Sequence, residues 1–473
     1  MMNSTSLLLA GLALATTAAF GKTIPNNAEA SLVLGQVDFI SKLAPFPPNA
    51  ASLRAPASVI VDPVTRKVFI ADGNHRVLRY ASADALANGA QAEAVFGQAL
   101  FTTINLAETS NQFGGGLGSI FLDTKGRLWV PDSAGNRVLR FDSASSCGSS
   151  PSASRVYGQP YFTAGTAATT STGMSRPYGV WVDSADRLWV ADSGNNRVLR
   201  FDSITTKPSG AAADGVLGQA NFTTSAPGSG NNGIDYPTGV TTSAGGSLYV
   251  TCFLAHRVMR FDNASGLGAN APASAVLGQP DFATVTPGTT AVKMSDPTGA
   301  WITPDDSLWV ADSGNNRVLR FNNASTKSSG AAADGVLGQP NFTSGLTAAT
   351  RRGMGFPSYR PSVDTTGSLW IADRNNHRVL RFSPDATPPL LAVTAPVKVT
   401  KKSKLVIKGI ASDAYGISKV EYRIGKGPLK LATGKTSWRF TANLKKGKNT
   451  ITIVATDNGG NPSVSSIIKI TRK

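Results

Sequence analysis

The sequence contains few of the residues that catalytic and metal sites most often use. Its 473 residues include only two cysteines and three histidines, and 16% are charged. Two cysteines cannot form a disulfide framework in a chain of this length, so we expect Cys147 and Cys252 to be unpaired. No H-E-x-x-H, C-x-x-C or D-x-D-x-D-G cluster is present, and the glycines at 114–116 are not followed by a phosphate-binding Lys-Ser/Thr pair. We therefore predict no catalytic residue, no metal site and no cofactor.

Long apolar runs are also missing. The most apolar segment, 7–20, is too short and too interrupted by threonine for a membrane span, and it leads into an Ala19-x-Gly21 arrangement before Lys22. We predict a secretory signal over 1–21, although no Lys or Arg precedes its apolar run. No later segment approaches 18 apolar residues. The mature chain is therefore predicted to lack a transmembrane segment and to be secreted, periplasmic or on the cell surface.

Positive charge is not spread evenly over the chain, whose formal net charge is +17. Residues 388–473 carry 14 Lys and three Arg against three acidic residues, a net charge of +14, and the other 387 residues carry only +3. A uniformly basic nucleic-acid binder is therefore disfavoured. Gly and Pro number 75, about 16% of the residues, which indicates a turn-rich folded protein rather than a disordered one.

Repetition is the most prominent feature of the sequence. The phrase WVADSGNNRVLRF occurs at 189–201 and 309–321, and related phrases occur at 69–80, 129–141, 249–261 and 370–382. The intervals between aligned positions are 60 residues four times and 61 once, for the series Asp72, Asp132, Asp192, Cys252, Asp312, Asp373. A second phrase, G-Q-x-x-F, also occurs six times. So strict a period indicates a repeat architecture.

Each repeat contains four short apolar segments bounded by turn residues, such as 178–183, 187–192, 197–202 and 215–219. Four strands per repeat is typical of a β-propeller blade. The first G-Q-x-x-F phrase precedes the first long phrase, so we expect the strand at 31–35 to complete the last blade. The sequence thus predicts an all-β fold whose main part, 31–383, is a six-bladed β-propeller closed by its N-terminal strand.

The pattern P-x-G-V followed by VAD-S-G-N-N/H-R-V resembles the NHL repeat. This resemblance covers roughly residues 31–383 and implies a propeller. It implies no particular activity, because NHL proteins include RNA-binding, protein-binding, sensor and lyase members. The repeats are longer than usual, and the extra residues fall in segments rich in Gly, Ser, Ala and Thr, such as 203–214 and 223–237, which we expect to be surface loops.

Residues that recur in every copy are predicted to build the fold rather than to perform chemistry. The aspartates that end the second strand are expected to accept turn amides and to pair with the arginine that begins the third. The aromatic series is expected to pack between blades. The three histidines stand where other copies have Asn and need not converge. The aromatic series is Phe69, Trp129, Trp189, Tyr249, Trp309, Trp370, and the histidines are His75, His256, His377.

The fourth repeat departs from the pattern, because TCFLAHR at 251–257 replaces ADSGNNR. Either the repeat has drifted, or its turn has been released from blade construction to contact a ligand. If the turn contacts a ligand, we expect it to lie on the same face of the propeller as the last inter-blade loop. The candidate binding residues are Phe253, His256, Arg257, Arg351, Arg352, Tyr359.

After a Pro-containing linker at 384–389 the period stops and β-like segments follow at 404–411, 417–424, 437–444, 449–457 and 465–472. With G-I-A-S-D-x-x-G-I-S-K-V-E-Y-R and A-T-D-N-G-G-N-P-S, residues 390–473 resemble bacterial Ig-like modules, which implies a β-sandwich used as a spacer or for surface adhesion.

The lysines of this module allow two interpretations. In the first, they keep sheet edges soluble and unpaired. In the second, they dock onto an anionic surface such as an acidic polysaccharide, lipopolysaccharide or extracellular nucleic acid. The candidates for docking are Lys401, Lys402, Lys404, Lys445, Lys446, Lys448.

Together these features favour a secreted or cell-surface binding or scaffold protein, expected to be a monomer. Its propeller face is expected to recognise a protein or a glycan, and its basic module to provide spacing or attachment to an anionic polymer. Two alternatives remain open: an extracytoplasmic lyase or hydrolase with a site at the propeller mouth, and a nucleic-acid-binding protein.

Overall fold

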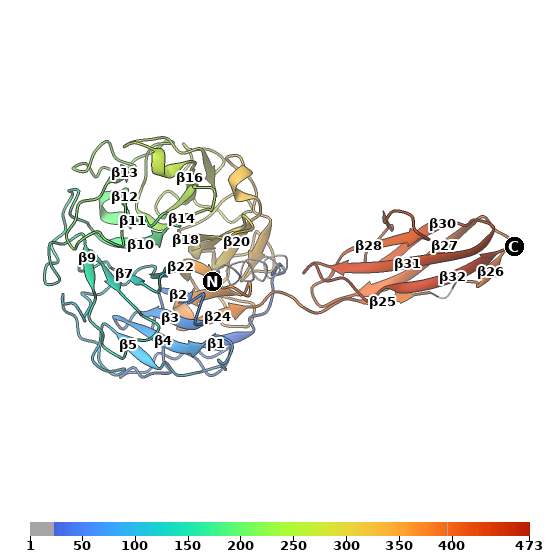
Figure 1. The fold of residues 1–473 in the computed structure, drawn as a ribbon, viewed down its shortest axis with the longest axis horizontal. Helices are drawn as coiled ribbons and strands as arrows, with labels where there is room; N and C mark the ends of the chain where they lie inside the picture. The colour runs from blue at the N-terminus through green and yellow to red at the C-terminus, as the bar shows by residue number, and fades with distance from the viewer. Residues whose placement is uncertain (1–22, 395) are drawn as a thin grey trace, which may run out of the picture. The chain divides into compact units, whose positions relative to one another are not determined.

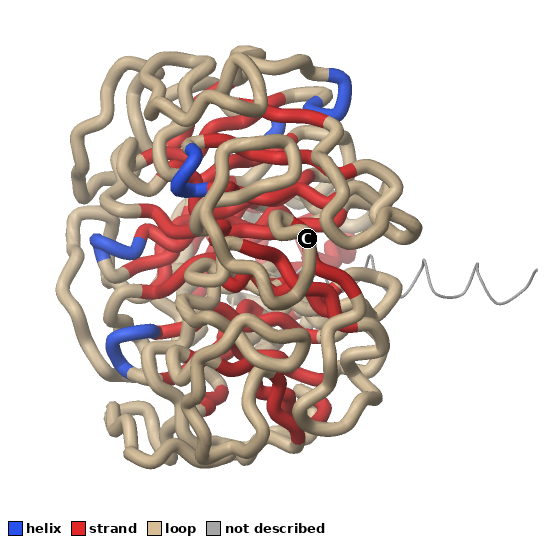
Figure 2. The backbone as a smooth tube through the Cα atoms, turned by 90° about the vertical axis from the view of Figure 1, so that its left-hand side faces the viewer, coloured by secondary structure: helices blue, strands red, loops and turns tan. Residues whose placement is uncertain are grey.

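The computed structural model describes residues 23–394 and 396–473, and almost all of its regular structure is β. The predicted secretory signal at 1–21 lies outside the described residues. The described chain divides into two compact units, Glu29–Phe382 and a second unit that contains Ser383–Lys473 and residues 23–28. No helix in the described part is long and apolar enough to cross a membrane. Figure 2 shows only short helical turns, which lie in the loops: η1 (Ser193–Asn195), η2 (Ala264–Gly266), η3 (Ser313–Asn315), η4 (Ala324–Thr326), η5 (Arg374–Asn376).

The larger unit consists of six antiparallel four-stranded sheets. Five of them take their strands in chain order: β2 (Ser58–Val61), β3 (Lys67–Asp72), β4 (Arg76–Ser82), β5 (Ala94–Phe96); β6 (Phe121–Leu122), β7 (Leu128–Asp132), β8 (Arg137–Phe141), β9 (Arg155–Tyr157); β10 (Pro177–Val182), β11 (Leu188–Asp192), β12 (Arg197–Phe201), β13 (Gly215–Leu217); β14 (Pro237–Thr242), β15 (Leu248–Cys252), β16 (Arg257–Phe261), β17 (Ala275–Leu277); β18 (Pro297–Ile302), β19 (Leu308–Asp312), β20 (Arg317–Phe321), β21 (Gly335–Leu337). The sixth combines β22 (Pro357–Val363), β23 (Leu369–Asp373), β24 (Arg378–Phe382), β1 (Leu32–Leu34). Here β1 pairs with β24 at the outer edge, across about 350 residues of sequence.

The first strand of each sheet is its innermost strand. Each of these strands contacts the first strands of the two neighbouring sheets, in the cyclic order β2, β6, β10, β14, β18, β22. Figure 1 shows the sheets arranged around a common centre. Glycine permits the close approach: a Cβ on Gly118 would collide with the Tyr178 carbonyl, and one on Gly299 would collide with the backbone of Tyr359. The unit is therefore a β-propeller, as its sequence predicts.

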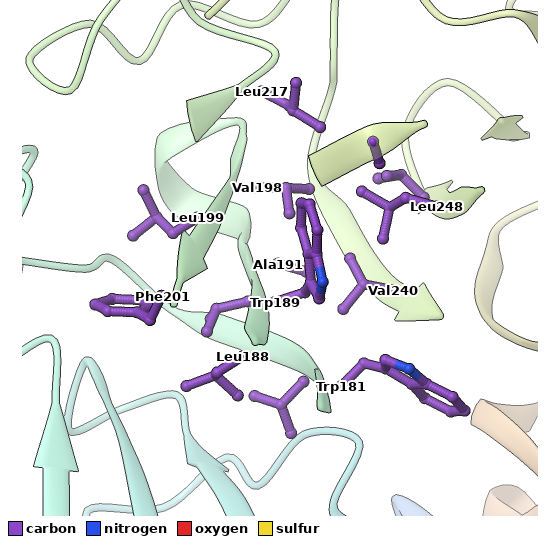
Figure 3. Close-up of a cluster of buried hydrophobic side chains, with 14 of the residues drawn as sticks. Trp181, Leu188, Trp189, Ala191, Val198, Leu199, Phe201, Leu217, Val240 and Leu248 are labelled. Carbon is purple, nitrogen blue, oxygen red and sulfur yellow. The ribbon is translucent and has the colours of Figure 1, made fainter. Parts of the chain in front are cut away.

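Apolar side chains fill the space between neighbouring sheets. Figure 3 shows Trp189 and Val198 of the β10–β13 sheet beside Val240 and Leu248 of the next sheet. Trp189 is 2% exposed, and Arg200 lies over its ring at 5.9 Å. The aromatic series is thus packed between sheets, as expected, because a blade buries both of its faces.

The repeated Asp-Arg pairs are also structural. In all five repeats that carry the aspartate, its carboxylate accepts a bond from the Nε of the strand-three arginine at 2.6–2.8 Å, and both side chains are fully buried. The same carboxylates accept backbone amides of the loop before the first strand, as Asp192 does from Ser175 at 2.7 Å. Each pair therefore ties a turn to the loop beside it, and the prediction of a structural role is confirmed.

The smaller unit has the two-sheet core of an Ig-like fold. Its sheets have the strand orders β25-β27-β30 and β26-β32-β31-β28-β29. Their strands are β25 (Leu390–Val393), β26 (Val399–Thr400), β27 (Lys404–Ser412), β28 (Ile417–Ile424), β29 (Lys430–Leu431), β30 (Ser437–Asn443), β31 (Gly447–Asp457), β32 (Ser466–Arg472). Trp438 and Phe440 are buried on alternate positions of β30, and the ring of Tyr422 stacks on Phe440 at 3.6 Å. The five longest strands match the predicted segments, and β25, β26 and β29 were not anticipated.

Candidate binding site

The 61-residue interval in the last repeat produces an irregular inner strand. In β22 the register shifts between Ser358 and Ser362, and three residues, 359–361, oppose the single residue Ile371 of β23. Tyr359 adopts a φ of +45°, in the left-handed region that non-glycine residues seldom occupy. The extra residue therefore changes which side chains this strand turns toward the centre of the propeller.

Arg360 occupies that centre. Its Nη1 donates to the Val180 carbonyl at 3.0 Å and its Nη2 to the Ile120 carbonyl at 2.5 Å. Its guanidinium carbon lies 5.1–5.3 Å from the ring centroids of Phe121, Trp181 and Trp301. These partners lie in or directly beside the inner strands of three other sheets, so a side chain that contacts all of them lies where those strands converge.

The guanidinium of Arg360 is buried without a carboxylate. The residue is 1% exposed, its Nε has no partner, and no ion pair involving it is found among the described residues. Burial lowers the pKa of Arg360 from its ordinary value. The three aromatic faces and two carbonyls partly compensate the charge. Arg360 and the three aromatic rings thus fill the centre of the propeller. None of the contacts of Arg360 described above comes from His, Asp or Glu.

Four aromatic side chains form a continuous row that begins beside Arg360, and we call it the aromatic row: Tyr359, Tyr178, Tyr236, Phe253. Tyr359 stacks on Tyr178 with ring centroids 5.6 Å apart, Tyr178 is 6.1 Å from Tyr236, and Tyr236 is 6.3 Å from Phe253. All four are partly exposed. They come from three sheets: β22, β10, and the β14–β17 sheet with its flanking turns.

The hydroxyl groups of Tyr178 and Tyr359 remain protonated at neutral pH. Burial, together with the neighbouring Tyr236, raises the pKa of Tyr178 to about 12. Burial also raises the pKa of Tyr359, and Arg374 of η5 acts in the opposite direction. A neutral phenol can both donate and accept a hydrogen bond. The row therefore combines flat apolar faces with polar phenol edges, and the cations Arg176 and Arg374 act on it.

Two of the six candidate binding residues, Phe253 and Tyr359, belong to this row. His256 and Arg257 do not. Arg257 is fully buried and donates to the carbonyls of Phe282, Gly230 and Gly233 at 2.6–3.1 Å. The Nδ1 of His256 accepts the backbone amide of Asp296 at 3.0 Å. Both side chains make bonds within the propeller, and their role as ligand contacts stays a prediction.

Arg351 and Arg352 are also separate from the row. Arg351 donates to the Ala30 carbonyl and lies over the Phe39 ring at 4.7 Å, and Arg352 pairs with Glu29 at 3.2 Å. These partners flank β1, the outermost strand of its sheet. The two arginines thus hold the segment that leads into β1, at the outer edge of that sheet rather than at its inner strand.

The Ig-like unit carries a separate basic groove of about 520 Å³, lined by five cationic side chains and by no acidic one. Lys445 and Lys448 of the predicted docking set line it, and Lys401, Lys402, Lys404 and Lys446 do not, although all six are exposed. The cationic side chains of the groove are Arg423, Lys426, Lys430, Lys445, Lys448. Within the described residues of 383–473, an ion pair forms only between Lys419 and Glu421. The five cations of the groove therefore have no carboxylate partner there.

Known families match two parts of the chain. The NHL repeat family matches residues 174–201, which contain β10, β11 and β12, and the bacterial Ig domain family (Big_7) matches residues 389–453. The protein is a β-propeller with an NHL repeat and a bacterial Ig domain. No curated protein sequence matches it significantly.

Several solved structures resemble this NHL propeller at low identity. A streptogramin B lyase is 11% identical with a TM-score of 0.41, and the match covers 72% of this chain and 95% of the lyase. The virginiamycin B lyase of Staphylococcus aureus is 14% identical with a TM-score of 0.38, over 69% and 94% of the two chains. The extracellular domain of a B. thetaiotaomicron protein described as a hybrid two-component system is 14% identical with a TM-score of 0.40, over 88% of this chain and 56% of that one. Similarities this weak assign no activity to the NHL propeller.

Sequence reasoning missed Tyr178, Tyr236 and Arg360. The signal for Arg360 was present, because the 61-residue interval and the segment PSYRPSVD both set the last repeat apart. Tyr178 lies in β10 at a position where other repeats of the NHL propeller carry small or polar residues, whereas at the position of Tyr236, just before the inner strand, the last repeat carries Phe356. Nothing in the sequence shows that these rings meet, because their contact depends on how the inner strands converge.

Proposed function

We propose that this protein is an extracytoplasmic binding protein whose propeller recognises its ligand through the aromatic row. The row of four partly exposed rings is the observation that carries this proposal. Two of its members, Phe253 and Tyr359, stand where the repeat pattern is broken, so blade construction does not require them. Exposed aromatic side chains on a rigid scaffold are typical anchors of binding surfaces.

The chemistry of the row favours a glycan. Sugar rings have apolar faces that can lie against aromatic rings and hydroxyl groups that can bond to neutral phenols. Arg374 adds a donor for ring oxygens or for acidic substituents. A protein ligand that offers similar groups remains the second class to test.

The basic groove supports a different role for the Ig-like unit, which is attachment to an anionic surface. Its five cations have no carboxylate partner among the described residues, so the groove presents an uncompensated positive electrostatic potential to the solvent. We propose that the propeller selects the ligand and that the basic unit retains the protein near an anionic polymer.

The aromatic row can be tested with single substitutions. We expect Tyr178→Ala and Phe253→Ala to weaken binding about tenfold or more in a glycan-array screen followed by calorimetry, because truncation of an aromatic anchor commonly costs more than about 1 kcal/mol. Tyr161→Ala is the matched control, since Tyr161 is an aromatic residue of the same unit, 61% exposed and outside the row. It should leave the affinity unchanged.

A ligand of the propeller that binds both row variants as tightly as the wild type would disprove the role of the row. Equal losses in the row variants and in Tyr161→Ala would point to a general change of the surface. Circular dichroism and thermal unfolding of each variant show whether the fold is retained.

A further inference from the structure

Three aspartates of the Ig-like unit meet although they are far apart in the sequence. Asp385 lies between β24 and β25, Asp413 follows β27, and Asp457 ends β31. One carboxylate oxygen of each lies within 4.8 Å of those of the other two. Their separations of 28 and 44 positions match no metal-binding motif, which is why the sequence predicted no metal site.

The cluster includes a buried oxygen that has no hydrogen-bond partner. Asp385 is 6% exposed, and its Oδ2 is buried without a hydrogen-bond partner. Its other oxygen accepts the Thr387 amide at 3.0 Å. A buried carboxylate oxygen with no partner is costly, and native structures usually satisfy such an atom with protein, water or an ion.

The other two carboxylates are held in place by their own loops. Asp457 is 1% exposed and accepts the amide and the side-chain nitrogen of Asn461 at 2.8 and 3.0 Å. Asp413 accepts the Tyr415 amide at 2.8 Å. These bonds fix two of the three carboxylates independently of any ion.

No cation of the protein compensates the cluster in the described structure, because no ion pair is recorded for any of its three members. Burial raises the pKa of Asp385, and the charges of Asp413 and Asp457 act in the same direction. Three like charges at this separation repel one another, so a cation bound between them would stabilise the cluster.

We propose that Asp385, Asp413 and Asp457 bind a calcium ion. The donors are all hard carboxylate oxygens, without a histidine or thiolate, which favours Ca²⁺ over transition metals. Three carboxylates leave coordination positions for water or backbone carbonyls, and Ca²⁺ tolerates the irregular geometry of three separate loops better than Mg²⁺ does. The ion joins Asp385, in the segment that enters the unit, to the ends of β27 and β31.

The site is tested on the full chain by thermal unfolding and calorimetry, with Ca²⁺ alone and Mg²⁺ alone added after treatment with EDTA. We expect Ca²⁺ to raise the Tm of the Ig-like unit saturably, with a half-effect at about 10⁻⁴ to 10⁻³ M, the range of extracellular calcium modules. Asp413→Asn and Asp385→Asn should raise that concentration about tenfold or more. Glu421→Gln, which removes a carboxylate of the same unit outside the cluster, should not change it.

A second measurement keeps the test decisive if a variant binds no ion. In EDTA, Asp413→Asn should be more stable than the wild type, since it removes one of three repelling charges. The proposal is overturned if wild type shows no saturable Ca²⁺ response up to about 10 mM, or if both aspartate variants respond as wild type does. A Mg²⁺ effect at lower concentration than that of Ca²⁺ would overturn the assignment to calcium.

Discussion

At the scale of single residues, the propeller separates side chains that recur from those that occur once. In five repeats the aspartate and the arginine are paired and buried, whereas Arg360 is equally buried and has no carboxylate partner. A buried unpaired charge costs free energy unless its surroundings compensate it, and here only carbonyls and aromatic faces do so. Arg360 is therefore a large side chain that fills the centre at an electrostatic cost.

Two substitutions separate the volume of Arg360 from its charge. Arg360→Ala should lower the free energy of unfolding by about 2–5 kcal/mol, because it leaves a cavity among three aromatic rings. Arg360→Met fills most of the same space without a charge, and we expect its stability to lie within about 1.5 kcal/mol of wild type or above it. Guanidinium chloride unfolding of the three proteins measures this. Equal destabilisation by both substitutions would show that the bonds to Val180 and Ile120 outweigh the packing.

At the scale of structural elements, the turn between the second and third strands links each sheet to the next. In five repeats its last residue accepts a backbone amide just before the first strand of the following sheet, at 2.8–3.0 Å. Histidine replaces asparagine twice and uses Nδ1 in place of the amide oxygen. The accepting residues are Asn136, Asn196, His256, Asn316, His377. At five of the six positions, His and Asn therefore make the same hydrogen bond.

This bond makes the propeller sensitive to acid. Burial lowers the pKa of His256, although the charges of Asp296 and Asp235 act to raise it. Burial and the charge of Arg54 lower the pKa of His377, and the charge of Asp72 acts to raise it. Since each folded pKa lies below the unfolded value of about 6.5, the unfolded chain binds more protons in acid, and stability falls as the pH drops below about 6.5.

The double variant His256→Asn with His377→Asn should lose less stability between pH 7.5 and pH 5 than the wild type, as measured by urea unfolding at both values. At pH 7.5 the two proteins should be similar, because asparagine makes the same bond in three other repeats. An unchanged pH dependence would mean that other groups cause the acid sensitivity.

Much of this element structure could be predicted from the sequence, because period and turn residues specify it locally. The strands of 178–183, 187–192, 197–202 and 215–219 became β10–β13, and the offset of the two repeated phrases anticipated the pairing of β1 with β24. The aromatic row could not be predicted, because it depends on convergence of strands from three sheets. The aspartate cluster was missed for the same reason.

At the scale of the whole molecule, most of the net positive charge lies in the Ig-like unit, and within that unit the charged side chains are distributed unevenly. Strand β27 runs from Lys404 to Ser412, so Lys401, Lys402 and Lys404 lie at its start and Asp413 just past its end, about 25–30 Å away. Lys445 and Lys448 flank the start of β31, and Asp457 ends it. The Ig-like unit is therefore basic at one end and acidic at the other.

Retention on a heparin column should depend on the basic end alone. We expect the full chain to elute at lower salt when Lys426, Lys445 and Lys448 are changed together to alanine, because exposed charges are screened by salt. Lys42→Ala, an exposed lysine of the propeller, serves as the control and should elute with the wild type. Retention that did not respond to ionic strength would contradict an electrostatic attachment.

The contacts of Arg360 also bear on how the chain finds its native order of sheets. Residues 189–201 and 309–321 are identical, so the sheets that contain them offer nearly equivalent partners during folding, a condition that favours misassembly in repeat proteins. Only one arrangement places β22 where its arginine reaches Ile120, Val180 and Trp301 together. The additional residue of the last repeat thus gives an otherwise periodic ring one position that differs from the others, and the contacts of Arg360 distinguish that position.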